Sequence, residues 1–203
     1  VLFKLMKDNN IRLSFQTAYR FPSNQQQYIN LQVGSTRLIG SNPAFATLYG
    51  FPGNPLYTFN SSAGSSILTN FKTFNPPAVK PESVNSFDVV YKGLLMENKL
   101  LVDVYGYFGQ YKDFLGRVNT IQTTSGLASD TANPNKRRNL SVVVNSSDKV
   151  KTYGFGLGLD YRLPLNFIVG ANLSSDVLKD VPANFVAYFN APKYKTNLSI
   201  GNT

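Results

Sequence analysis

The chain has 203 residues, no cysteine, no histidine and a formal net charge of +9. Without these two residue types it has no disulfides, no thiolate chemistry, none of the usual zinc sites and no Ser-His-Asp arrangement. The positive charge is spread along the chain, with Lys136-Arg137-Arg138 as its only tight run, so nucleic-acid binding is not predicted. No apolar run approaches the roughly 18 residues that a transmembrane helix needs.

Apolar and polar residues alternate in a series of segments along the chain. Because successive side chains of a strand point to opposite faces, each such segment is predicted to be a β-strand with one apolar face. In chain order the segments are 1–6, 11–21, 87–95, 100–109, 152–163, 167–174 and 194–200. The fifth and sixth are joined by a short Pro-Leu-Asn break and are predicted to form a hairpin.

Three glycines, Gly154, Gly156 and Gly158, share the non-apolar face of the fifth segment. Their spacing differs from the dinucleotide-binding fingerprint, and no helical pattern follows them. We expect instead that side chains are missing where another group packs close to the strand, or where the strand bends.

The connections between the predicted strands alternate between short and long. Short turns fall at residues 7–10, 96–98 and 164–166, and long polar connections at 22–83, 117–150 and 177–192. An antiparallel meander would therefore place all tight turns at one end and all long loops at the other, as outer-membrane barrels do. Structureless loops of this length are uncommon in compact soluble domains. The predicted fold is all-β, an antiparallel meander forming part of a transmembrane β-barrel with long external loops.

The two strand faces carry different chemistry. Tyr153 and Tyr161 lie eight residues apart on the apolar face, about 26 Å along a strand and about 20 Å of height after tilting, close to the spacing of aromatic girdles. Packing of these tyrosines in a soluble sheet is the alternative. The opposite face is that of a barrel lumen or of a solvated sandwich exterior, and it holds Arg12, Gln16, Arg20, Asp88, Lys92, Asp103, Asp160 and Arg162.

Elements flanking the longest loop suggest a family. Tyr19-Arg20-Phe21-Pro22, the following QQQYINLQVG, and Lys80-Pro81-Glu82 at the next strand resemble the C-terminal barrel of TonB-dependent outer-membrane receptors, most closely the SusC-like branch. The resemblance implies a barrel of about 22 strands with a plug. Residues 1–203 contain about seven predicted strands and no plug pattern, so we expect them to be one part of such a barrel.

The resemblance implies energy-coupled import of an oligosaccharide or peptide across the outer membrane of a Gram-negative bacterium. Its partners would be a SusD-like surface lipoprotein, the TonB complex acting through the plug, and membrane lipid and lipopolysaccharide, with no cofactor, metal or nucleic acid. No enzymatic activity is expected, since nothing marks Asp103 and Asp160 as an acid/base pair. The alternative function is that of a secreted or surface-exposed β-sandwich module for adhesion or binding.

Candidate substrate-facing residues lie in the first long loop and on the polar strand face. Aromatic rings stack on sugars or contact peptide side chains, and amides such as those of Gln25, Gln26 and Gln27 bond to either ligand. The candidates are Tyr28, Tyr49, Tyr57, Arg20, Asp103 and Tyr105. Packing of the loop aromatics, including Phe45, within the loop or against a lid is the alternative. Lys136-Arg137-Arg138 is expected either to meet lipopolysaccharide phosphates or to form a solvated loop tip.

Overall fold

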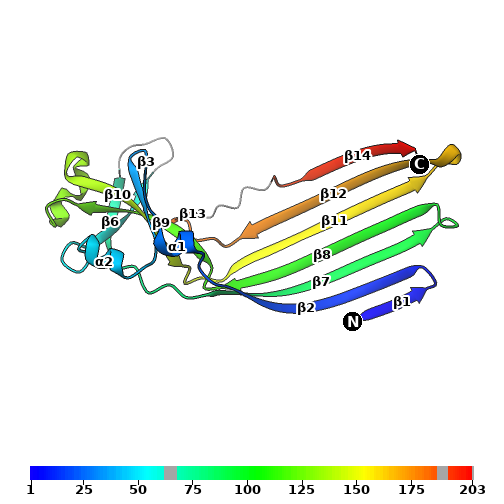
Figure 1. The fold of residues 1–203 in the computed structure, drawn as a ribbon, viewed down its shortest axis with the longest axis horizontal. Helices are drawn as coiled ribbons and strands as arrows, with labels where there is room; N and C mark the ends of the chain where they lie inside the picture. The colour runs from blue at the N-terminus through cyan, green and yellow to red at the C-terminus, as the bar shows by residue number, and fades with distance from the viewer. Residues whose placement is uncertain (62–67, 187–191, 203) are drawn as a thin grey trace.

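The computed structural model describes residues 1–61, 68–186 and 192–202. Strands make up 62% of the chain and helices 11%, which confirms the all-β prediction. The strands form two sheets, which lie end to end rather than face to face (Figure 1). None of the helices in the described part of the chain is long and apolar enough to cross a membrane.

The first sheet, called here the wall sheet, contains seven strands, and every neighbouring pair is antiparallel. These strands coincide with the seven alternating segments and extend beyond several of them. In spatial order they are β1 (Leu2–Met6), β2 (Asn9–Arg20), β7 (Glu82–Leu95), β8 (Leu100–Lys112), β11 (Val150–Arg162), β12 (Phe167–Lys179) and β14 (Lys195–Asn202). The sheet is open, with β1 and β14 at its edges.

Tight turns join β1 to β2, β7 to β8 and β11 to β12, all at one end of the wall sheet (Figure 1). Met96, Glu97 and Asn98 have φ angles of 51°, 53° and 67°, so this turn uses the left-handed conformation. The last of the three turns contains the 3₁₀ helix Pro164–Asn166. The pairing of β11 with β12 runs without a shift, which confirms the predicted hairpin.

The two faces of the wall sheet follow the predicted alternation across neighbouring strands. Phe15, Phe87, Phe108 and Tyr153 occupy one cross-strand row on four adjacent strands, and all four rings are exposed. A parallel row on the same face contains Ile11, Tyr91, Val104, Leu157 and Leu173. The opposite face carries polar pairs such as Lys92 beside Asp103. The wall sheet therefore presents a wide apolar face that the described residues of this chain leave uncovered.

The second sheet, called here the external sheet, forms from the segments that join the wall strands at the end opposite the tight turns (Figure 1). It contains, in spatial order, β3 (Asn30–Val33), β4 (Thr36–Ile39), β10 (Arg137–Asn145), β9 (Leu115–Thr123), β5 (Leu56–Ser61) and β6 (Leu68–Phe74). A short strand, β13 (Phe185–Val186), also pairs with β9, and β4 runs parallel to β10. The described parts of the long connections predicted at 22–83, 117–150 and 177–192 therefore contain strands of their own, which the alternating pattern does not predict.

Short helices complete the external sheet region. They are α1 (Asn24–Tyr28), α2 (Ala44–Leu48) and the 3₁₀ helices Ala128–Ala132 and Pro134–Lys136. Phe45 and Ala46 of α2 pack against a buried cluster formed by Ile39, Phe51, Leu56, Val118, Leu140, Val142 and Val144. Strand β9 is buried at every residue except Asn119, which means that both faces of this strand are covered. The hydrophobic core of the described chain thus lies in the external sheet.

Candidate functional site at the junction of the two sheets

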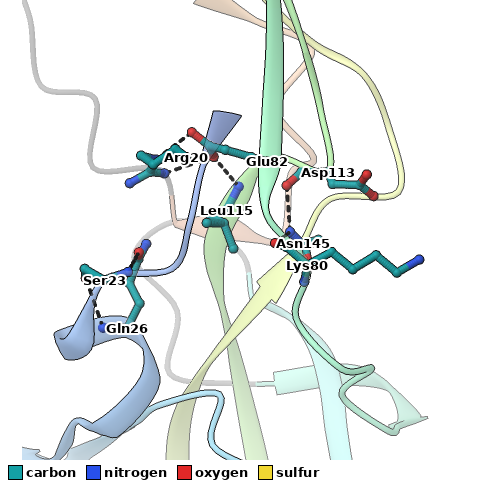
Figure 2. A network of polar contacts seen from close by, with 8 residues as sticks. All are labelled: Arg20, Ser23, Gln26, Lys80, Glu82, Asp113, Leu115 and Asn145. Carbon is teal, nitrogen blue, oxygen red and sulfur yellow. Dashed lines mark hydrogen bonds and ion pairs between the residues drawn. The ribbon is translucent and has the colours of Figure 1, made fainter. Parts of the chain in front are cut away.

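A buried carboxylate joins the wall sheet to the external sheet. Arg20 ends β2 and Glu82 begins β7, and their register pairing places the two side chains together. The guanidinium donates from Nε to Oε1 at 2.6 Å and from its Nη2 atom to Oε2 at 2.9 Å (Figure 2). Glu82 is only 4% exposed, and its Oε2 also accepts the backbone N–H of Leu115 at 2.8 Å. Three donors thus satisfy the carboxylate and fix the start of β9 against the wall.

An asparagine makes the second connection at this junction. Asn145, the last residue of β10, donates from Nδ2 to the carbonyl oxygens of Lys80 at 2.9 Å and of Asp113 at 2.6 Å. Its Oδ1 accepts the backbone N–H of Lys80 at 2.7 Å (Figure 2). One side chain therefore ties the end of β10 to the segment before β7 and to the turn between β8 and β9.

The sequence elements that carry the family resemblance meet at this junction. Arg20 belongs to the aromatic-Arg-x-Pro element and Glu82 to the Lys-Pro-Glu element, and the two form the bidentate pair described above. Proline favours an extended conformation in the residue before it, which suits Lys80 for its backbone contacts with Asn145. The junction therefore explains physically why these two short elements accompany each other.

Helix α1 begins directly after this junction with a capping box. The Ser23 hydroxyl oxygen accepts the backbone N–H of Gln26 at 3.2 Å, and the Gln26 Oε1 accepts the backbone N–H of Ser23 at 3.0 Å. The Gln27 amide donates to the carbonyl oxygen of Pro22 at 2.6 Å. Gln26 and Gln27 thus hold the helix in place, whereas Gln25 is exposed.

A cavity of about 580 Å³, called here the mouth pocket, opens beside the Arg20–Glu82 pair. This volume lies within the range of about 300–1,000 Å³ that is typical of ligand pockets. Its wall combines hydrogen-bonding side chains with apolar and aromatic ones. The residues that contribute most to this mixed character are Arg20, Ser23, Gln25, Gln26, Tyr111 and Phe114. The pocket can therefore hold a ligand that has both polar groups and apolar surface.

Of the six predicted substrate-facing residues, only Arg20 lines the mouth pocket. Tyr28 lies on α1 and is 58% exposed. Asp103 lies on the polar face of the wall, with an oxygen 3.5 Å from the Lys92 Nζ. Tyr105 lies on the same face, and its ring covers Gly156 of β11. The structure thus distributes these residues over separate parts of the molecule.

The other two tyrosines belong to the external sheet. The Tyr49 hydroxyl donates to the Asn30 Oδ1 at 2.7 Å, and its ring stacks on Phe51 with the ring centres 6.1 Å apart. The Arg138 guanidinium lies 5.2 Å from the centre of the same ring. Tyr57 is only 6% exposed and packs in the buried interior of the sheet. Its ring therefore exposes little surface for stacking on a substrate, and the role expected of Tyr57 stays a prediction.

Each residue of the basic run has a partner within the external sheet region. Lys136 forms an ion pair with Asp130 at 3.1 Å, and the Arg137 guanidinium donates to the carbonyl oxygen of Thr131 at 2.8 Å. Arg138 donates from Nε to the Gln122 Oε1 at 2.8 Å. The run is thus anchored to the folded sheet at its base.

Close packing explains two of the three glycines in β11. A Cβ atom at Gly154 would lie 2.6 Å from a ring carbon of Tyr107, and one at Gly156 would overlap the ring of Tyr105. Both tyrosines come from the neighbouring strand β8. The expectation that another group packs closely against this strand is confirmed for these positions.

Gln122 is a structural residue that no sequence pattern marks. Its side chain is fully buried, and its amide donates to the carbonyl oxygens of Tyr49 at 2.9 Å and of Asn54 at 2.6 Å. Its Oε1 accepts from Arg138. No local pattern marks these contacts, because all three partners lie far away in the sequence.

Comparison with known protein families assigns the chain. Residues 1–203 match the family described as TonB dependent receptor-like, beta-barrel. The chain belongs to this family. No curated protein matches it. Membership of the TonB-dependent receptors implies import of a substrate across the outer membrane through interaction with TonB, in a family of transporters rather than enzymes. The wall sheet supplies antiparallel strands of the receptor barrel, and the end-to-end arrangement of the two sheets contradicts a sandwich.

Proposed function

We propose that this TonB-dependent receptor imports an oligosaccharide or a peptide, and that the mouth pocket contacts the substrate on its way into the lumen. The observation that carries the proposal is the position of this pocket at the external end of the polar wall face, where Arg20 and Thr152 of the wall face α1 and β9 of the external sheet. A substrate that entered from outside would pass this point before it reached the polar face.

The chemistry of the mouth pocket suits both substrate classes. The exposed Gln25 amide can donate to and accept from hydroxyl or peptide groups. Tyr111 and Phe114, whose rings pack edge to face with centres 5.4 Å apart, supply an apolar surface for a sugar ring or a side chain. The Arg20 guanidinium is held by Glu82, so it positions the pocket wall and keeps its remaining N–H groups for the ligand.

The remainder of the receptor follows from the open edges of the wall sheet. We propose that residues 1–203 supply about a third of the barrel, and that further strands pair with β1 and β14 to close it around a plug. The row of Phe15, Phe87, Phe108 and Tyr153 fits one aromatic girdle of that barrel. Opposite it, Tyr161 lies eight residues further along β11, as a second girdle would require.

A SusD-like lipoprotein is the lid that we propose for the external sheet. Large apolar side chains stand exposed on this region, as expected of a surface that contacts a partner. They include Tyr28, Leu31, Val33, Leu48 and Leu127. The SusC-like branch is proposed on the same grounds together with the loop sequence described above.

Uptake by intact cells tests the role of the mouth pocket. We expect the double variant Gln25→Ala/Phe114→Ala to raise the KM for uptake of a labelled oligosaccharide or oligopeptide about 5- to 20-fold, because a hydrogen bond and an aromatic contact are lost. Asn135→Ala, an exposed asparagine outside the pocket, is the matched control. Receptor abundance is measured by surface immunolabelling. Unchanged uptake of every substrate that the unaltered receptor imports would refute the role of this pocket.

A further inference from the structure

A second cavity lies in the external sheet, away from the mouth pocket. It has a volume of about 870 Å³ and is called here the amide cleft. Its lining includes Phe59, Asn60, Asn70, Lys72, Asn119 and Asn184. Among the described residues, Val186 alone lines both cavities. The amide cleft is therefore a separate site.

The cleft exists because two strands share one edge of β9 without meeting. Strand β5 pairs with β9 only at Leu56 and Tyr57, opposite Gln122 and Ile121. Strand β13 pairs with the same strand at Val118 and Arg117. Asn119 and Thr120 lie between the two pairings, and Asn119 is the single exposed residue of β9. The sheet edge thus opens at the residue whose amide faces the cavity.

An irregularity in the β5–β6 hairpin shapes the opposite wall of the cleft. The register shifts between Thr58 and Asn60, and Asn70 adopts a left-handed φ of 53°. A bulge of this kind redirects the side chains next to it. Here both Asn60 and Asn70 line the cavity.

The polar groups of the amide cleft are available to a ligand. Four asparagine side chains line it, those of Asn60, Asn70, Asn119 and Asn184, and within the described residues none of these amides has a hydrogen-bond partner. Each amide offers two N–H donors and one carbonyl acceptor. Among the described residues that line the cleft, none is a carboxylate and Lys72 is the one cation.

Aromatic surface accompanies these amides. Phe59 lines the cleft and is half-buried, so it supplies apolar surface there. The Phe185 ring packs on Gly116, where a Cβ atom would overlap it, and this contact fixes β13 at the rim. An apolar ring beside several amides matches a ligand whose hydroxyl groups form hydrogen bonds while its C–H faces stack on the ring.

A smaller cavity of about 260 Å³ lies next to the cleft and shares Phe59 and Asn119 with it. This second cavity is lined by Asn139 and Arg137, whose guanidinium already donates to the carbonyl oxygen of Thr131. A ligand longer than one sugar ring can therefore contact both cavities around Phe59 and Asn119.

We propose that the amide cleft binds a linear, uncharged oligosaccharide on the external sheet. One lysine among several uncharged amides does not make the cleft prefer an anionic ligand over an uncharged one. A peptide would be expected to add a strand to an open sheet edge and to place alternate side chains in apolar pockets. The unpaired side-chain amides around Phe59 instead match rows of hydroxyl groups. This site does not depend on the import role of the mouth pocket, because a ligand can bind here whether or not transport occurs.

Calorimetric titration of the purified receptor in detergent tests the proposal. The probes are maltohexaose, cellohexaose, xylohexaose and mannohexaose, with a Gly-Ser hexapeptide as the alternative ligand. We expect at least one hexasaccharide to bind, and Phe59→Ala and Asn119→Ala each to weaken it about 5- to 10-fold, as loss of one stacking or hydrogen-bonding group does. The conservative variant Asn119→Asp keeps the shape of the side chain, replaces its two N–H donors with an acceptor, and is expected to weaken binding similarly.

Controls separate this site from folding and from the mouth pocket. Asn135→Ala changes the same residue type at an exposed position outside the cleft, and it should leave binding unchanged. Gln25→Ala/Phe114→Ala should leave the affinity of the amide cleft unchanged, and any separate binding event that this variant removes belongs to the mouth pocket, so failure of the mouth pocket's role would not affect this result. Circular dichroism confirms folding of each variant. The proposal is overturned if no hexasaccharide binds, if the cleft variants bind as well as the unaltered receptor, or if the hexapeptide binds more tightly and the same variants weaken it.

Discussion

The wall sheet and the external sheet place their apolar residues in opposite ways. In the wall, rows such as Phe15, Phe87 and Phe108 remain exposed, and the polar residues lie on the other face. In the external sheet, Leu56, Val118 and Leu140 are at most 1% exposed and pack within the chain. The external sheet therefore holds its own core, whereas the wall needs lipid on its apolar face. The two sheets of this chain therefore bury their apolar side chains in different environments, one in protein and the other against lipid.

This comparison predicts that charge is tolerated least in the external core. Leu140→Asp places a carboxylate at a fully buried position among apolar side chains. We expect a loss of more than about 4 kcal/mol, enough to unfold the external sheet. Limited proteolysis of the receptor in detergent should then cut the external sheet and spare the wall. Leu127→Asp, at a 59% exposed leucine, is the control and should leave the cleavage pattern unchanged.

The wall should respond to charge according to face. Leu157 lies midway between Tyr153 and Tyr161 on the apolar face, so Leu157→Arg places a charge near the bilayer centre. The expected cost is about 2–4 kcal/mol of barrel stability. Asp160→Asn, on the polar face of the same strand, should cost much less. Unfolding titrations of the receptor in lipid vesicles compare the two, and equal effects would contradict the assignment of the faces.

The sequence predicts the wall sheet better than the external sheet, because wall strands bury their apolar residues on one face, whereas strands of the external core are buried on both. Each wall strand has one apolar face toward lipid and one polar face on the opposite side. Apolar and polar residues therefore alternate with a period of two, and this pattern is visible within a single segment. Strands buried on both faces lose this alternation. Val142, Val143 and Val144 form a continuous apolar run, which is the one local indication of a buried strand in that region. The pairing of β4 with β10 joins Thr36 to Asn139 and has no local signal.

The residues of the junction between the two sheets also differ in how well the sequence predicts them. Arg20 and Glu82 were visible as parts of two short elements, because their contact accompanies a regular strand pairing. Gln122 and Asn145 were not, since their partners come from distant segments that only the folded external sheet brings together. The same reason makes Tyr57 buried and Tyr28 exposed, although both are loop tyrosines in the sequence.

The junction between the sheets should be weakened without unfolding either of them. Glu82→Gln keeps an acceptor for the Leu115 N–H and loses the charge that pairs with Arg20. The Arg20 side chain is 52% exposed, so solvent screens this pair, and we expect a cost of about 1–2 kcal/mol. Hydrogen exchange should quicken at the Leu115 amide. Glu97→Gln, at an exposed glutamate in the turn between β7 and β8, should leave that amide unchanged.

The smallest expected effect lies at the surface of the external sheet. A hydrogen bond from the Ser125 hydroxyl, at 2.6 Å, and the contact with Lys136 lower the pKa of the Asp130 carboxyl below its ordinary value. A lowered pKa in the folded state means that the carboxylate adds stability above its unfolded pKa of about 3.9, and that this stability is lost as the pH falls through the lower, folded value.

Because the Asp130 carboxylate contacts Ser125 and Lys136 of the same short segment, the change should be local rather than global. Hydrogen exchange of the amides in 125–136 should quicken, after correction for the intrinsic rate, as the pH falls below about 4 in the unaltered receptor. Asp130→Asn should show the faster exchange already at neutral pH and no further change on acidification. The same pH dependence in Asp130→Asn would mean that another group titrates. An unchanged rate in both proteins would mean that the Ser125 and Lys136 contacts do not order this segment, although the core of the external sheet beneath it remains intact.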